Sequence, residues 1–167
     1  MHTPSAGQTY AKRETGELYL LFSLDQDRYA LSVHEVVEVL PLRRLKAFPQ
    51  APSWVAGGFE YRGALVPVID LLVRACARPA AALTSTRLVL VQYRPANRVL
   101  GLILEKATDT LRLPTSAFAD SALHAGEAQY LGGVQRSAQG LVQRIEVAGL
   151  LPADVRALLF PEPGGAP

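Results

Sequence analysis

Short apolar segments separated by polar turns run along most of this chain. Their lengths, about four to eight residues, are typical of β-strands rather than of helices. The segments fall into two similar sets, one in each half of the sequence. They cover residues 19–24, 29–33 and 35–40 in the first half, and residues 87–91, 99–104 and 105–113 in the second half.

Each half closes with a glycine-hinged hairpin of the same pattern. A Gly-Gly pair (residues 57–58 and 132–133) precedes a lone glycine (Gly63 and Gly140), and an apolar strand then ends on an acid (Asp70 and Glu146). With these hairpins each half has about five short strands, and glycines at bends are typical of small closed or nearly closed barrels. The sequence therefore predicts a mainly β protein built as a tandem repeat, with function on its surfaces and in the groove between the halves.

Two of the expected strands, residues 18–24 and 88–91, are apolar at consecutive positions. A strand of this kind buries both of its faces. One face is expected to meet the interior of its own barrel, and the other face is expected to meet the sister barrel. Pro67 removes a ladder donor from the expected strand 64–70, so that strand is expected at an edge or beside a bulge.

The chain is expected to form a single domain over residues 17–160, between a flexible N-terminus (1–16) and a flexible tail (161–167). The first subdomain covers residues 17–76 and the second covers residues 86–150. Residues 78–85 cross between them, and residues 119–128 form a second polar break.

Two short helices are expected. Asp70 is the predicted N-cap of a helix over residues 71–76, at the end of the first subdomain. A C-terminal amphipathic helix is predicted over residues 152–160. It begins with Pro152 and is expected to dock through Val155, Leu158 and Leu159.

The composition limits the kinds of partner that the chain is expected to bind. The 167 residues carry 17 basic and 15 acidic side chains without a run of like charges that could follow a phosphate backbone, so nucleic acid is not expected to bind. The apolar runs are far shorter than the roughly 18 residues that span a membrane, so direct membrane insertion is not expected. Cys76 is the single cysteine, and the first residues lack the regions of a secretory signal, which favours the cytoplasm.

Candidate catalytic and metal-binding groups are sparse. His2, His34 and His124 are far apart, without a pair at the spacing of metal ligands on a helix, and Cys76 has no base beside it in the sequence. Neither Gly-Gly pair is followed by the Lys-Ser/Thr of a P-loop or by a helix with dinucleotide-binding spacing. Catalytic residues, cofactors and metals are therefore not expected.

One stretch of the chain is similar to a known family. Residues 49–71 contain Trp54-Val-Ala-Gly-Gly-Phe-Glu-Tyr-Arg-Gly, followed by Ala-Leu-Val-Pro-Val-Ile-Asp, and this pattern resembles the CheW-like adaptors of bacterial chemosensory systems. The resemblance covers nearly all of residues 17–160. Supporting matches are Tyr29-Ala-Leu, Val36 with Glu38-Val-Leu, Gly101-Leu-Ile-Leu and Tyr130-Leu-Gly-Gly-Val.

The resemblance implies both a fold and a function. The fold is a pair of five-stranded SH3-like β-barrels packed together, and the protein is a non-enzymatic adaptor. It couples the cytoplasmic tip of a methyl-accepting chemoreceptor to the C-terminal regulatory domain of a CheA-type histidine kinase, at membrane-associated receptor clusters. The receptor occupies a groove between the halves in this family, and the kinase contacts lie at the barrel ends, where no residue of this chain can be assigned.

The resemblance also implies site residues. The receptor-binding positions carried over are Val36, Glu38, Gly57, Arg62 and Gly63. Glu60 joins this set, because it stands where the family usually has Asn and places a negative charge near Arg62.

Two further departures concern Glu105, where Asp is usual, and Arg144, which interrupts an apolar strand. Together with Glu60 they indicate a partner other than the standard swimming receptor, such as one of a surface-sensing or pilus-linked pathway.

The residues themselves support several interpretations of this site. Arg62 is expected to project from a turn, where its planar guanidinium can bind a carboxylate through two hydrogen bonds. Glu38 or Glu60 could supply that carboxylate, but a surface ion pair contributes only about 0–1 kcal/mol. Val36 taken alone is more often a core residue, and Trp54 is more often a packing residue than a binding anchor.

Two other functions stay open beside the adaptor. A regulatory module that binds a small effector between the barrels would need a concave apolar site with a few converging polar groups. A cofactor-free enzyme is the less favoured alternative, because function must be argued from a site and the sequence shows no catalytic set.

Overall fold

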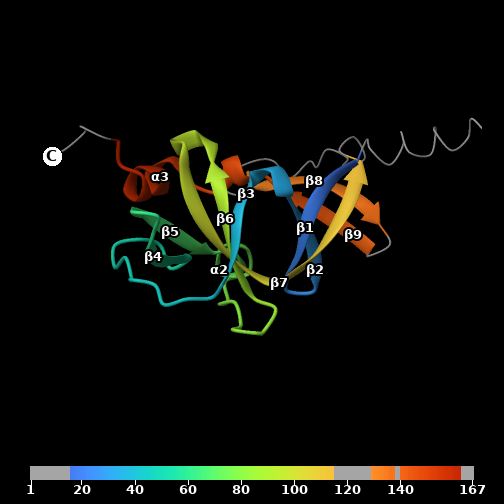
Figure 1. Ribbon diagram of the computed structural model, residues 1–167, viewed down its shortest axis with the longest axis horizontal. Coiled ribbons are helices and arrows are strands. Elements are labelled where there is room, and N and C mark those ends of the chain that lie inside the picture. Colours follow the sequence, from blue (N-terminus) through green and yellow to red (C-terminus); the bar gives the residue numbers. More distant parts are fainter. Residues whose placement is uncertain (1–15, 115–128, 138–139, 163–167) are drawn as a thin grey trace, which may run out of the picture.

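A computed structural model of the protein describes residues 16–114, 129–137 and 140–162. The expected mainly β fold is confirmed (Figure 1). Apart from residues 16, 161 and 162, the expected flexible ends lie outside the described residues, as does the polar break at 119–128. The strands are β1 (Gly16–Leu24), β2 (Asp27–Ser32), β3 (Val36–Pro41), β4 (Val55–Tyr61), β5 (Ala64–Asp70), β6 (Arg87–Tyr93), β7 (Arg98–Pro114), β8 (Leu131–Ser137) and β9 (Gly140–Ile145).

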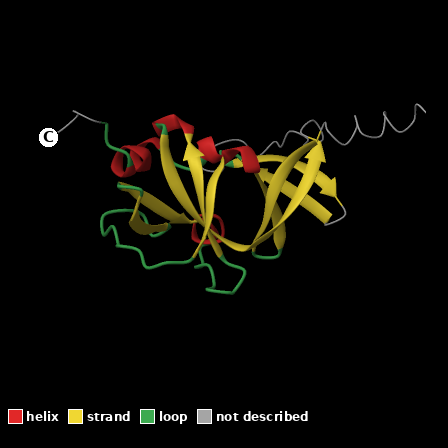
Figure 2. Cartoon of the chain, viewed as in Figure 1, coloured by secondary structure: helices red, strands yellow, loops and turns green. Residues whose placement is uncertain are grey.

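The helices are short and lie beside the strands (Figure 2). They are α2 (Leu71–Cys76), α3 (Ala153–Leu159) and the 3-10 turns η1 (Val33–Glu35), η2 (Arg94–Ala96) and η5 (Val147–Gly149). As expected, the Asp70 carboxylate caps α2 and accepts hydrogen bonds from the backbone N–H groups of Leu72 at 3.0 Å and Val73 at 3.3 Å. In α3, Val155 is buried but Leu158 is exposed, so the docking face of this helix is narrower than predicted.

The strands form two groups that lie side by side (Figure 1). The first, which we call the β6 group, has the order β3, β6, first part of β7, β5, β4. The second, which we call the β1 group, has the order second part of β7, β1, β2, β9, β8. Two five-stranded modules are therefore present, as the sequence predicted, but among the described residues the strand pairing does not close the sheet into a barrel.

Strand β7 runs through both groups. Residues 98–104 pair with β6, and residues 105–114 pair with β1. The sequence analysis expected two separate segments here, residues 99–104 and 105–113. The structure corrects this expectation: Glu105 is buried, and its carboxylate accepts a 2.6 Å hydrogen bond from the backbone N–H of Ala81. Lys106 has a positive φ of 53°, so the chain can bend there without ending the strand.

The two halves of the sequence exchange their third strands. The β1–β2 hairpin is followed by β3, which pairs with β6 of the second half. The equivalent hairpin of β6 and the first part of β7 is followed by the second part of β7, which pairs with β1 of the first half. The expected division into residues 17–76 and 86–150 therefore does not follow the strand pairing, because each group takes strands from both halves.

The glycine-hinged hairpins occupy equivalent positions in the two groups. β4 pairs with β5 and β8 pairs with β9, and in both hairpins the register shifts near the Gly-Gly pair, between residues 55 and 57 and between residues 131 and 134. β5 then runs parallel to β7, and β9 runs parallel to β2. The repeated pattern in the sequence thus corresponds to a repeated structural unit.

The sheet of the β6 group is open between its outer strands β3 and β4. Among the described residues, a backbone bridge crosses this opening from Lys46, in the segment after β3, to Gly58 on β4, with N–O distances of 2.8 and 2.9 Å. Pro67 pairs with Gly58, next to the bulge in β4, which is the second of the two placements expected for it. The pairing of β5 with β7 begins only at Val68, so the missing donor of Pro67 breaks no ladder bond on that side.

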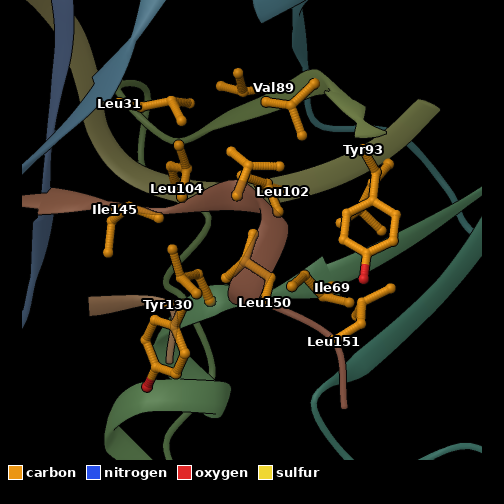
Figure 3. Packing of buried hydrophobic residues seen from close by; sticks show 14 of the residues in the cluster. Leu31, Ile69, Val89, Tyr93, Leu102, Leu104, Tyr130, Ile145, Leu150 and Leu151 are labelled. Atoms are coloured by element: carbon orange, nitrogen blue, oxygen red, sulfur yellow. The ribbon is translucent and has the colours of Figure 1, made fainter. Parts of the chain in front are cut away.

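A shared core joins the two groups. Consecutive residues of β6 alternate between cores, since Leu88 packs inside the β6 group and Val89 packs in a cluster that contains residues of both groups. In β1, Tyr19 packs inside the β1 group and Leu20 packs in the shared cluster. The predicted burial of both faces is therefore confirmed. Figure 3 shows part of the shared cluster: Leu31, Ile69, Val89, Tyr93, Leu102, Leu104, Tyr130, Ile145, Leu150 and Leu151.

Candidate functional site

A cluster of three polar side chains lies where β3 meets the β4–β5 turn. The Tyr61 hydroxyl, at the end of β4, donates a short hydrogen bond to Glu38 Oε1 on β3. The same carboxylate oxygen lies 3.8 Å from a terminal guanidinium nitrogen of Arg62. The Arg62 guanidinium also lies over the Tyr61 ring, 5.1 Å from its centroid. Of the two acids considered from the sequence, Glu38 is therefore the one that pairs with Arg62.

Arg62 and Gly63 form the two-residue turn between β4 and β5. Tyr61 pairs with Ala64 across this turn, and both central residues have positive φ, 50° at Arg62 and 82° at Gly63. Positive φ at both positions is the pattern of a type I′ hairpin turn, which favours Asn or Gly. Arginine is therefore a strained choice at the first position, and the turn projects its side chain outward as expected.

The exposure of this cluster limits its value for stability. The Arg62 side chain is 77% exposed and that of Glu38 is 39% exposed. An exposed ion pair at 3.8 Å contributes about 0–1 kcal/mol, which does not exceed the roughly 1 kcal/mol cost of a non-glycine residue with positive φ. Folding stability alone does not account for an arginine at this position.

Tyr61 is the residue of the cluster that the sequence analysis missed. The hydrogen bond to Glu38 is the main reason that the pKa of Tyr61 is raised above its usual value. This tyrosine therefore stays neutral and a donor over the whole physiological range. The available signal was its place directly before Arg62 at the end of an expected strand.

Val36 and its neighbours give β3 two different faces. Val36 is half-buried and packs against the shared core, so its side chain is largely a packing residue. Val37 and Val39 point the other way and are 43% and 44% exposed. These two valines, which the sequence analysis did not select, give β3 an exposed apolar surface on the face opposite Glu38.

Gly57 is a buried backbone position, whereas Glu60 presents an exposed side chain. Gly57 is buried with a φ of 138°, and a Cβ atom there would lie 2.3 Å from the carbonyl oxygen of Lys46. It shapes the approach of β4 to the segment after β3 and offers no side chain to a partner. Glu60 is exposed on β4, in register with Leu65. Within the described residues the structure shows no ion pair between Glu60 and Arg62.

The remaining singled-out residues lie elsewhere. Trp54 packs against the shared core, in agreement with the packing interpretation. The guanidinium carbon of Arg74 lies 4.7 Å from the centroid of the Trp54 ring. The Arg144 side chain is only 23% exposed, with its guanidinium 5.9 Å from the Tyr19 ring centroid and its Nε 3.7 Å from Glu146 Oε1. Arg144 itself is therefore largely covered, whereas Leu141 of the same strand is 60% exposed.

Two other kinds of site are absent from the described residues. Within residues 16–114, 129–137 and 140–162, no three His, Cys, Asp or Glu side chains gather as a metal ion would require. The same described ranges contain no helix with the length and hydrophobicity of a membrane span.

Comparisons with known proteins point to one family. The family model described as CheW-like domain matches residues 18–155. The chain is 23% identical over 160 residues to the chemotaxis protein CheW of Klebsiella aerogenes, an alignment that covers 92% of this chain and 90% of that protein. It is 27% identical over 106 residues to the chemotaxis protein CheW of Bacillus subtilis, over 64% of this chain and 67% of that protein.

A solved structure has the same fold. The crystal structure of the scaffolding protein TtCheW from Thermoanaerobacter tengcongensis matches with a TM-score of 0.73 at 19% identity. The match covers 84% of this chain and 90% of that chain. At this identity the likeness concerns the fold alone.

Proposed function

From the premise that this chain belongs to the CheW-like domain family, whose model spans residues 18–155, we propose that it is a non-enzymatic adaptor of a bacterial chemosensory pathway. It couples the cytoplasmic tip of a chemoreceptor to a CheA-type histidine kinase, at receptor clusters beside the membrane. The names of the relatives, chemotaxis protein and scaffolding protein, support this role. The protein holds two others together and transforms neither of them.

The observation that carries the receptor site is the exposed guanidinium of Arg62, held in a strained turn beside Glu38. Strained residues that the fold does not need are enriched at functional sites. A guanidinium that is 77% exposed can exchange its 3.8 Å contact with Glu38 for a closer contact with a partner carboxylate. We therefore assign to Arg62 the recognition of an acidic side chain on the receptor.

Apolar contact complements this charge. Val37 and Val39 on β3 present side chains that are more than two-fifths exposed. Val37 and Val39 lie on the face of this outer strand opposite Glu38, so a receptor tip would have to cover the edge of β3 to contact both the valines and Arg62.

The other proposed receptor-binding residues act through position and shape. Val36 and Glu38 fix β3 and orient Arg62, and Gly57 and Gly63 set the bulge and the turn that present it. Glu60 adds a negative charge to the same hairpin. This charge supports a receptor of a surface-sensing or pilus-linked pathway, whose tip would carry fewer carboxylates at that point.

A binding assay tests the receptor site. Immobilised receptor cytoplasmic tip should capture the wild-type chain, and Arg62→Glu or Glu38→Arg should weaken capture at least about tenfold, since charge reversal at an interface costs several kcal/mol when it is desolvated. Arg136 is also an exposed arginine and lies on β8, so Arg136→Glu is the matched control and should bind as the wild type does. Binding of all variants to the kinase C-terminal domain should be unchanged. Equal receptor capture by all three variants would remove Arg62 and Glu38 from the site.

A further inference from the structure

A cleft with a volume of 630 Å³ lies at the junction of the two strand groups. Its walls come from the segment before β4, from α2, from Gln129 ahead of β8, and from the C-terminal segment that leads into α3. This volume falls within the range of about 300–1,000 Å³ typical of small-molecule sites. None of the proposed receptor-binding residues lines it.

The first polar group of the cleft is Arg74, near the end of α2. Its guanidinium carbon lies 4.7 Å from the centroid of the Trp54 ring and 5.1 Å from that of the Tyr130 ring. Two aromatic rings therefore contact this guanidinium and restrict its movement. An arginine fixed in this way loses little side-chain entropy when it binds a ligand.

The second polar group is Arg156 of α3. Its Nε donates a 3.2 Å hydrogen bond to the hydroxyl of Tyr93, and the buried Tyr93 ring stacks on Phe160 at 5.7 Å. This bond fixes one edge of the guanidinium. The two terminal nitrogens take no part in it, and a planar guanidinium suits a carboxylate or a phosphate.

The charge and the surface of the cleft indicate its ligand. Arg74 and Arg156 face one acidic lining residue, the exposed Asp154, which leaves an excess of one positive charge. Trp54, Leu151 and Pro152 add apolar wall. We propose that this cleft binds a small organic anion, whose carboxylate or phosphate pairs with Arg156 and Arg74 and whose apolar body lies against Trp54 and Leu151.

This site is independent of the receptor-binding proposal. Its walls bring together Pro52 and Trp54, ahead of β4 of the β6 group, and Gln129, ahead of β8 of the β1 group. A ligand that touches both walls binds only while the groups keep this arrangement, so it stabilises that arrangement by its binding free energy. The adaptor would then respond to a metabolite as well as to its receptor.

Trp54 provides a direct measurement, because it is the only tryptophan of the chain. Its fluorescence is followed while two probes are titrated at constant ionic strength: phenyl phosphate, and benzoate as the carboxylate counterpart. We expect a saturable fluorescence change for at least one probe. The probe that binds with the higher affinity identifies the charged group that the cleft prefers.

Two variants make the test specific. Arg156→Gln keeps a donor for Tyr93 but loses the charge, and it should weaken binding about tenfold, as expected for a charge-assisted hydrogen bond. Asp154→Asn removes the exposed acid and should strengthen binding a few-fold. Arg136→Gln is the control outside the cleft, and circular dichroism checks that each variant is folded. No saturable change with either probe, or equal affinity in Arg156→Gln and Asp154→Asn, would overturn the proposal.

Discussion

The hydroxyl of Tyr61 donates a hydrogen bond to the carboxylate of Glu38, and this bond ties β4 to β3, two strands that share no ladder. β3 and β4 are the two outer strands of the β6 group, and the segment after β3 contacts β4 through the backbone bridge at Lys46 and Gly58. The bond therefore closes the open side of the sheet at the place where Arg62 emerges. Tyr61 and Glu38 thus join the two strands and also support the arginine that we propose binds the receptor.

Replacing Arg62 by Asn separates the effect of this residue on folding stability from its proposed role in receptor binding. Asn is favoured at the first position of a type I′ turn, whereas arginine is strained at its φ of 50°. We expect Arg62→Asn to raise the free energy of unfolding by about 0.5–1 kcal/mol, measured by urea denaturation. The same variant should lose receptor capture. A less stable Arg62→Asn protein would show that the arginine is there for the fold.

Gly57 and Gly63 should respond differently to alanine. A Cβ at Gly57 would lie 2.3 Å from the Lys46 carbonyl oxygen, whereas a Cβ at Gly63 meets nothing within 4 Å. Both positions have positive φ. Gly57→Ala should therefore lower the free energy of unfolding by about 2 kcal/mol or more, and Gly63→Ala by only about 1 kcal/mol. Equal losses in urea denaturation would mean that the contact with Lys46 carries no cost.

Local patterns explain what the sequence predicted well. The hairpins are defined by nearby glycines, and the cap of α2 is defined by Asp70 directly before its first turn, so both follow from neighbouring residues. The burial of both faces of β1 and β6 follows from their continuous apolar runs.

Long-range pairing explains what the sequence could not show. The partner of β3 is β6, about fifty positions later in the chain, and no local signal distinguishes it from a partner in the same half. The continuity of β7 was hidden by Glu105, whose buried charge is accommodated by a hydrogen bond from Ala81, a residue of the connection between the halves. The Glu38–Tyr61 bond was missed for the same reason, since it depends on strands being brought together.

The strand exchange predicts that neither half folds alone. A fragment of residues 17–85 would contain β1 and β2 without β9, and β3 without β6, and it would lack most of the shared core. We expect circular dichroism of this fragment to show no cooperative thermal transition, and the full chain to show a single one. A cooperative transition in the fragment would contradict a single folding unit.

Cys76 should react slowly with alkylating agents. Partial burial, and then its hydrogen bond to Asp25, raise the pKa of this thiol from 9.0 to about 11. Because the thiolate is the reactive form, alkylation by iodoacetamide at neutral pH should be about a hundredfold slower than that of an ordinary thiol. The rate should rise with pH to a midpoint near 11, and Asp25→Asn should move that midpoint down.

The same shift has a consequence for stability. The pKa of the Cys76 thiol is higher in the folded chain than its usual value, so the contribution of this thiol is fully present below pH 9. It is lost as the pH rises towards 11. Cys76→Ser should remove this part of the pH dependence in urea denaturation measured across that window. An unchanged dependence would show that the thiol is not the group that titrates.

The adaptor role is tested most directly by a bridging measurement with three components. The C-terminal regulatory domain of the kinase is immobilised, the receptor cytoplasmic tip is applied, and the retained receptor is measured with and without this chain. We expect receptor retention only when the chain is present, rising with its concentration until the kinase sites are filled, and falling with Arg62→Glu. Receptor retention that does not depend on the chain, or no retention at any concentration of it, would contradict the proposal that this protein joins the two.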